Sequence, residues 1–128
     1  KISQLLIDYK IPAIIISNTS DRARDYLINI NKLEKGGLSG KPLEEKSNNV
    51  INKFYNNLGK QIKIIGVGGV DSGESALKKI LNGATLVQLY TGMVYNGPDI
   101  ANKISEELNN LVEKQGVINI SELVGTKK

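Results

Sequence analysis

A glycine-rich segment, GVGGVDS at residues 66–72, is the first candidate for chemistry in this 128-residue chain. It follows an apolar, β-branched run and precedes a segment with helical periodicity. Glycines at such a junction let the backbone approach a ligand closely, and the free N–H groups of a helix N-terminus favour an anion. A tight turn that binds nothing would need the same glycines, so the segment alone leaves both interpretations open.

A second glycine-bearing segment strengthens the case for a phosphate group. Tyr90-Thr91-Gly92 follows the next apolar run, and Asn96-Gly97-Pro98 opens the helix after it. In (β/α)8 barrels the loops after the last two strands frequently hold a phosphate together. Two successive strand ends with glycine therefore favour phosphate binding over turn chemistry alone.

Small polar side chains at a third strand end suggest contact with a substrate. Ser17-Asn18-Thr19 follows the apolar run at residues 13–16. Asn offers both a donor and an acceptor, which suits a ligand with carboxylate and amide groups. The alternative is that Asn18 and Ser17 only cap or turn the backbone. A connection from residue 19 to residue 43 follows, far longer than the ~2–6 residues usual for a βα loop, and long loops at strand ends often carry function.

Composition excludes several classes of function. The chain has no Cys and no His, which excludes thiolate chemistry and removes the commonest general base and metal ligand. Any redox chemistry must therefore come from a cofactor, and we expect no metal site. The net charge is +4, but the lysines are scattered along the chain rather than clustered, and aromatic residues are few. We therefore expect no nucleic-acid partner. The apolar runs are too short to span a membrane.

Strand-like and helix-like segments alternate along the chain. Continuous apolar runs, typical of parallel strands buried on both faces, occupy residues 13–16, 62–67 and 85–89. Helical faces are predicted around residues 2–9, 50–58, 72–82 and 98–115, with Glu74 as the capping acid of the third. A last short turn is predicted at residues 121–124.

This order predicts an α/β fold with right-handed crossovers. Three parallel strands alternating with helices make a poor free-standing sheet. They fit better as the C-terminal part of a (β/α)8 TIM barrel, where neighbouring strands complete the sheet. A doubly wound sheet without its first strands is the alternative. Because no capping residue precedes the first helix, we expect sequence upstream of Lys1.

Several motifs in order resemble those of dihydroorotate dehydrogenases. The stretch at residues 64–84, IIGVGGVDSGESALKKILNGA, is similar to the signature of that family. The similarity extends through Ser17-Asn18-Thr19, GGLSGKPL at residues 36–43 and QLYTG at residues 88–92. The last two segments resemble the class 2 branch, which is membrane-associated and linked to quinone. The resemblance covers nearly the whole chain and implies a TIM barrel that binds flavin mononucleotide (FMN).

The resemblance also implies roles for individual residues. Its FMN-binding positions correspond to Ser17, Gly40, Gly69, Tyr90 and Thr91. Gly69, Tyr90 and Thr91 would contact the phosphate end. Ser17 stands where the family usually has Thr, and it keeps the hydroxyl.

The substrate positions that the resemblance implies are Asn18 and Thr19, which would contact dihydroorotate or orotate. The family's catalytic serine, a flavin-contacting lysine and the membrane-docking helices have no counterpart in residues 1–128. We therefore expect no catalytic residue in this chain. Residues 1–128 would form the C-terminal half of one FMN-binding barrel domain, with no separate second domain.

The whole enzyme would oxidise dihydroorotate to orotate in pyrimidine synthesis, taking a proton from C5 and passing a hydride from C6 to the flavin. A quinone would then be reduced. The whole enzyme would lie on the inner (cytoplasmic or mitochondrial) membrane. This segment would have the missing N-terminal part of the barrel as a partner, and alone it would be soluble and inactive. The alternatives are another FMN-dependent barrel oxidoreductase and a non-catalytic remnant of a split gene.

Overall fold

The computed structural model describes residues 1–22 and 24–127, and its elements follow the predicted alternation. The α-helices are α1 (Ile2–Asp8), α2 (Glu44–Leu58), α3 (Gly73–Leu81), α4 (Thr91–Asn96) and α5 (Ile100–Lys114). The strands are β1 (Ala13–Ile16), β2 (Lys63–Val67) and β3 (Leu86–Gln88). Three short 3-10 helices are η1 (Ile30–Leu33), η2 (Lys41–Leu43) and η3 (Ile120–Leu123). The elements that the sequence pattern does not predict are helix α4 and the 3-10 helices η1 and η2.

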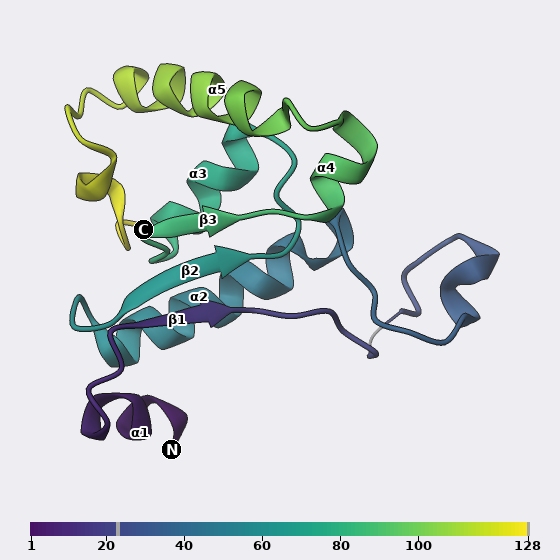
Figure 1. The fold of residues 1–128 in the computed structure, drawn as a ribbon, viewed down its shortest axis with the longest axis horizontal. Helices are drawn as coiled ribbons and strands as arrows, with labels where there is room; N and C mark the ends of the chain where they lie inside the picture. The colour runs from purple at the N-terminus through teal and green to yellow at the C-terminus, as the bar shows by residue number, and fades with distance from the viewer. Residues whose placement is uncertain (23, 128) are drawn as a thin grey trace.

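The three strands form one parallel sheet with β2 in the centre (Figure 1). Ile14 pairs with Ile64, and Ile65 pairs with Leu86. Each crossover carries a helix, as parallel strands require. The carboxyl ends of all three strands therefore lie at one edge of the sheet, where the predicted site residues follow them.

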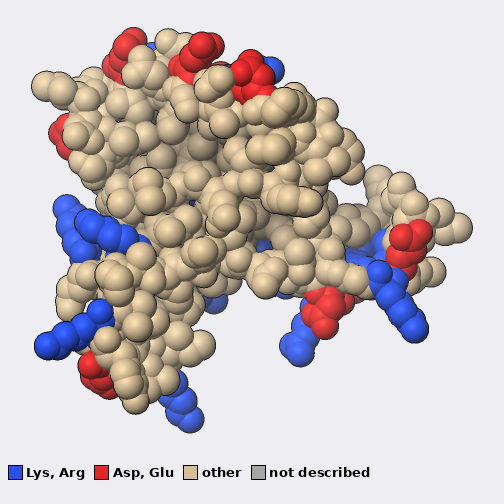
Figure 2. All heavy atoms as spheres, in the orientation of Figure 1, with Lys and Arg blue, Asp and Glu red and all other residues tan. Residues whose placement is uncertain are grey.

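Helices cover only one face of this sheet in the described residues, so the expectation that all three strands are buried on both faces was wrong. Ile16 and Ile64 are buried against Ile51 of α2. Side chains alternate across a strand, and on the other face Ile15 is 56% exposed and Leu86 60%. Figure 2 shows an uncharged surface over the strands, with charged side chains gathered at its margins.

Helix α3 begins with its own capping box at the end of the glycine-rich segment. Ser72 Oγ accepts a hydrogen bond from the Ser75 N–H, and Ser75 Oγ accepts one from the Ser72 N–H at 3.0 Å. Ser75 therefore has the capping role that the sequence pattern assigns to Glu74. The box fixes the direction in which the chain leaves β2 and enters α3.

The long connection between β1 and α2 lies beyond the carboxyl ends of the strands and projects from the body of the molecule (Figure 1). Its two arms are joined to each other by a pair of backbone hydrogen bonds between Ser20 and Leu38. Tyr26, Ile28 and Leu33 are largely exposed on it. Among the helices described, none is long and apolar enough to cross a membrane.

Candidate functional site

One cavity of about 260 Å³ collects every residue that the sequence predicts to bind a ligand. It lies at the carboxyl ends of the strands. The predicted residues in its lining are Ser17, Asn18, Thr19, Gly40, Gly69, Tyr90 and Thr91. The other lining residues are Ser39, Leu43, Val67, Gly68, Val70, Leu89 and Gly92, so no side chain in the lining carries a charge.

Gly68 and Gly69 form the floor of the cavity in backbone conformations that favour glycine. Their φ angles are 111° and 78°. A Cβ atom on Gly69 would lie 2.6 Å from both the Cα and the N atom of Glu44, at the start of α2. Glycine at position 69 is therefore required by packing against α2, independently of any ligand.

The two helices that begin near the cavity differ in how their N-termini are satisfied. At α3 the Gly73 N–H donates to Glu107 Oε2 at 2.7 Å, and Ser72 and Ser75 complete the capping box. This end is filled by the protein's own acceptors, which corrects the prediction that it receives an anion. Helix α4 begins at Thr91 without a side-chain cap. The part of the backbone open to a ligand is therefore the end of β3 and the glycine pair, not the start of α3.

The polar triplet after β1 faces the cavity and is also held by local hydrogen bonds. Asn18 Oδ1 accepts from the Thr19 N–H at 2.8 Å, which is the turn-forming role given above as the alternative. Ser17 N–H and Ser17 Oγ lie 3.3 and 3.4 Å from the Val67 carbonyl oxygen, linking the ends of β1 and β2. The Asn18 side-chain amide N–H₂ is the group that remains for a ligand.

The GGLSG segment at residues 36–40 closes one side of the cavity. Thr91 Oγ1 donates to Ser39 Oγ at 3.0 Å. A Cβ atom on Gly40 would lie 2.9 Å from Thr91 Cγ2, and one on Gly37 would overlap the Thr19 side chain. The glycines of this segment therefore let the loop pack across the ends of both β1 and β3.

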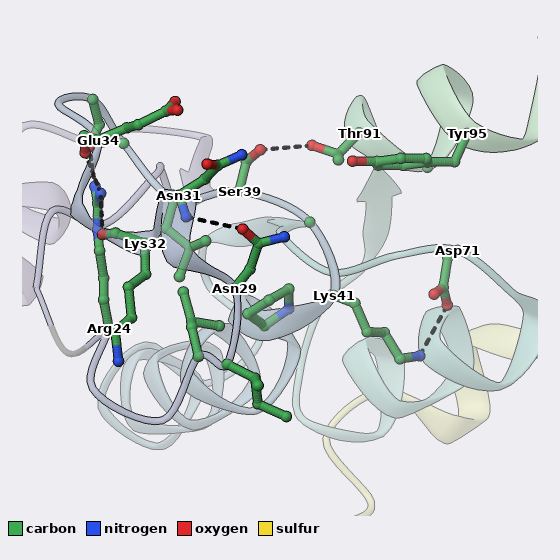
Figure 3. A pocket seen from close by; sticks show the side chains of 18 of the residues that line it. Arg24, Asn29, Asn31, Lys32, Glu34, Ser39, Lys41, Asp71, Thr91 and Tyr95 are labelled. Carbon is green, nitrogen blue, oxygen red and sulfur yellow. Dashed lines mark hydrogen bonds and ion pairs between the residues drawn. The ribbon is translucent and has the colours of Figure 1, made fainter.

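A larger cavity of about 730 Å³ lies beside the first, between the β1–α2 connection and α4 (Figure 3). Several of its polar groups hold the connection itself. Arg24 donates to the backbone carbonyls of Lys32 and Glu34, at 3.3 and 2.7 Å, and to that of Gly36. Asn29 Oδ1 accepts from the backbone of the loop as well. The smaller cavity, with its converging glycines and hydroxyls, is the better candidate site.

Ion pairs fasten η2 to the start of α3 below the site. Lys41 Nζ lies 2.9 Å from Glu44 Oε2 and 3.0 Å from Asp71 Oδ1, and Lys78 Nζ lies 3.3 Å from Glu44 Oε1. Burial alone would raise the pKa of Glu44, but hydrogen bonds from Lys41 and Lys78 outweigh it and lower that pKa below its usual value. Glu44, the residue against which Gly69 packs, therefore stays ionised at neutral pH.

Sequence reasoning missed the buried polar group behind the glycine segment. Lys79 is 0% exposed and donates to Ser47 Oγ and Asn48 Oδ1 of α2. The signal was available in part, because Lys79 follows Ala76 by three residues on the apolar stripe of α3. Its partners lie 31 and 32 positions earlier in the chain, and no local pattern identifies them.

Comparison with known proteins decides the family. A sequence model described as dihydroorotate dehydrogenase matches residues 1–112. The chain belongs to the dihydroorotate dehydrogenase family. A dihydroorotate dehydrogenase (quinone) of Buchnera aphidicola subsp. Schizaphis graminum is 49% identical over 108 residues, which cover 84% of this chain and 32% of the relative. One of Brucella anthropi is 45% identical over 116 residues, covering 91% of the chain and 32% of that relative.

Solved structures of dihydroorotate dehydrogenases support the same fold. The ligand-free DHODH of Eimeria tenella superposes with a TM-score of 0.93 at 33% identity, covering 98% of this chain and 34% of that one. Its complex with ferulenol gives the same TM-score. The chain thus spans about a third of the length of its relatives. The predicted fold class, a partial TIM barrel with three parallel strands between helices, is confirmed.

Proposed function

We propose that this chain provides the FMN phosphate site and part of the substrate site of a quinone-linked dihydroorotate dehydrogenase. The whole enzyme would oxidise dihydroorotate to orotate and pass the electrons to a quinone. Residues 1–128 would belong to one barrel domain whose remaining strands come from sequence that the relatives have and this chain does not. That missing part of the barrel would be a direct partner of the open sheet face.

The observation that carries the proposal is the convergence of seven predicted residues on one cavity. They come from four separate segments: residues 17–19, 40, 69 and 90–91. The volume of about 260 Å³ is below the ~300–1,000 Å³ of typical ligand pockets. It suits one end of a nucleotide cofactor, with the rest of the cofactor lying against the missing part of the barrel.

The residues present fit the phosphate end of FMN. Gly69 brings bare backbone to the cavity floor, and the uncapped backbone at Thr91 faces it from the end of β3. Backbone N–H groups of this kind bind phosphate oxygens without a charged side chain. Ser17 and Gly40 would contact FMN from the opposite strand end and from the loop. When bound, FMN would supply the capacity to accept a hydride.

Asn18 and Thr19 would hold the substrate rather than the cofactor. The Asn18 amide can donate to a carboxylate or carbonyl oxygen of dihydroorotate while its Oδ1 keeps the turn. Thr19 lies against Gly37, so its side chain borders the loop that closes the cavity. No residue of this chain is assigned the proton transfer, which would fall to the missing part of the barrel. We propose no nucleic-acid partner, and any membrane contact would come from that missing part.

The test uses a fused enzyme, in which this chain follows the N-terminal two thirds of the Buchnera relative. We expect the fused enzyme to retain FMN through purification and to lose its visible flavin absorbance when dihydroorotate is added without oxygen. Lactate and other hydroxy acids should leave the absorbance unchanged. A folded fused enzyme without flavin, or one reduced equally by unrelated substrates, would contradict the proposal.

A further inference from the structure

A buried lysine lies directly behind the glycine segment of the proposed phosphate site. The whole of Lys79 is inaccessible to solvent, on the side of β2 that faces α2 and α3. Lysine is almost never fully buried unless its ammonium group is paired or hydrogen-bonded. Nζ of Lys79 donates to Ser47 Oγ at 3.1 Å and to Asn48 Oδ1 at 3.0 Å.

Ser47 links Lys79 to β2, the strand that ends in the glycine segment. Its hydroxyl donates to the Val67 carbonyl oxygen at 2.6 Å. A hydroxyl has one hydrogen to donate, and the ammonium group of Lys79 can only donate, so the ammonium directs the hydrogen of Ser47 toward Val67. The same carbonyl lies 3.4 Å from Ser17 Oγ. The chain of contacts therefore joins Lys79 to two strand ends that line the cavity.

The glycines of this segment make room for the arrangement. A Cβ atom on Gly66 would lie 3.2 Å from Cδ of Lys79, and one on Gly68 would lie 3.3 Å from Cβ of Ser47. Both distances are shorter than ordinary van der Waals contact. Two of the glycines that suggest a ligand thus also pack closely against the lysine and serine behind them.

The cavity contains no charged side chain in its lining, whereas an FMN phosphate carries negative charge. A buried cation acts through a medium of low dielectric constant, where its attraction is stronger than across water. Burial lowers the pKa of Lys79 to about 8, and the charge of Glu44 opposes that change. Most Lys79 side chains therefore carry their charge at neutral pH.

We infer that Lys79 is a positioning residue for the phosphate end of FMN, acting through Ser47 to hold the backbone between Val67 and Gly69 and adding positive charge behind it. This inference rests on the proposed function. It concerns mainly the phosphate, because the contacts of Lys79 lead directly to the glycine segment and reach Ser17 only through the Val67 carbonyl oxygen. The binding affinity of a flavin without a phosphate should therefore depend little on Lys79.

The experiment compares the dissociation constants of FMN and riboflavin in the fused enzyme, measured by flavin fluorescence quenching after the flavin has been removed. Lys79→Met keeps the length of the side chain and removes the charge. We expect FMN to bind roughly tenfold more weakly, the scale of losing a hydrogen bond to a charged group, and riboflavin to change less than about twofold. Lys53→Met, which removes an exposed lysine of α2, should change neither constant.

Ser47→Ala is the second variant, and it decides the matter if Lys79→Met does not fold. It removes the hydroxyl that reaches Val67, and we expect the same selective loss of FMN affinity, not additive with Lys79→Met. Equal weakening of FMN and riboflavin, or no weakening of either, would overturn the role of Lys79 while the proposed function stands. An unsubstituted fused enzyme that does not prefer FMN to riboflavin would overturn both.

Discussion

The β2–α3 junction at residues 66–72 and the β1–α2 connection at residues 20–40 both border the proposed site, but they are built differently. The junction is packed on buried side chains of α2 and α3, and its glycines touch Glu44, Ser47 and Lys79. The connection is largely exposed and is held by Arg24 through bonds to its own backbone. The junction thus draws its geometry from the core, whereas the part of the connection around Arg24 is held by hydrogen bonds within the connection itself.

The largest effect should follow from substituting Gly69 in the junction. Gly69→Ala places a Cβ atom 2.6 Å from the backbone of Glu44, so we expect the fused enzyme to lose more than about 3 kcal/mol of unfolding free energy. Gly97→Ala is the matched control, because Gly97 has φ 80° against 78° for Gly69 but nothing within 4 Å of its Cβ position. It should cost only the ~1–2 kcal/mol of left-handed backbone.

Chemical denaturation of the two variants measures this difference. Equal losses would show that the contact with Glu44 is unimportant. The sequence alone suggests that a side chain at position 69 displaces the ligand and leaves the fold intact. Because a side chain at position 69 also collides with Glu44 of α2, loss of FMN in a Gly69 variant cannot separate an effect on binding from an effect on folding.

Asn18→Ala should have the next largest effect, on turnover. It removes an amide that would position the substrate, and misplacement by about 1 Å can cost on the order of 100-fold in rate. Steady-state oxidation of dihydroorotate by the fused enzyme measures the loss, with FMN content unchanged. If the Asn18→Ala enzyme had wild-type kinetics, the role of Asn18 would be limited to forming the turn through its bond to the Thr19 N–H.

The charge of Lys79 behind the junction predicts that the binding of FMN depends on pH. Because burial lowers the pKa of Lys79 to about 8, its charge is present below that pH and is lost above it. We expect the preference for FMN over riboflavin to fall by roughly tenfold as pH rises through about 8.

The charge that acts on Lys79 is that of Glu44, which pairs with Lys41 and Lys78. Glu44 has a lowered pKa and stays ionised throughout, and Lys41, which pairs with Glu44, has a raised pKa. Lys78, the other partner of Glu44, is tested by Lys78→Met, which should keep the pH dependence. A Lys79→Met enzyme should show none. A preference with the same pH dependence in Lys79→Met would assign the titration elsewhere.

The smallest effect on binding should come from the connection. Arg24→Ala removes the donors to the Lys32 and Glu34 carbonyls, so the amides of residues 31–37 should exchange with solvent roughly tenfold faster. The amides of residues 64–72 and the FMN content should not change. Arg22→Ala, which removes an arginine that is 88% exposed, is the control. Faster exchange at the junction in Arg24→Ala would show that the two regions are coupled.

The sequence predicts the elements well because apolar runs and helical periodicity are local signals. The bounds of β1 match the prediction at both ends, and all seven site residues meet in one cavity. Two failures have physical causes. Continuous apolar runs do not show which face of a strand the described chain covers, so exposed Ile15 and Leu86 were unforeseen. The contact between Lys79 and Ser47 joins helices distant in sequence, and no spacing rule predicts it.

The most direct test of the central claim is an activity assay on separated parts. Quinone-dependent oxidation of dihydroorotate is measured for this chain alone, for the N-terminal two thirds of the Buchnera relative alone, and for the two mixed with FMN. We predict no turnover by either part and turnover only after mixing, because a catalytic base must reach within about 2.6–3.2 Å of the substrate proton and we assign that base to the other part of the barrel. Robust turnover by residues 1–128 alone would contradict the account.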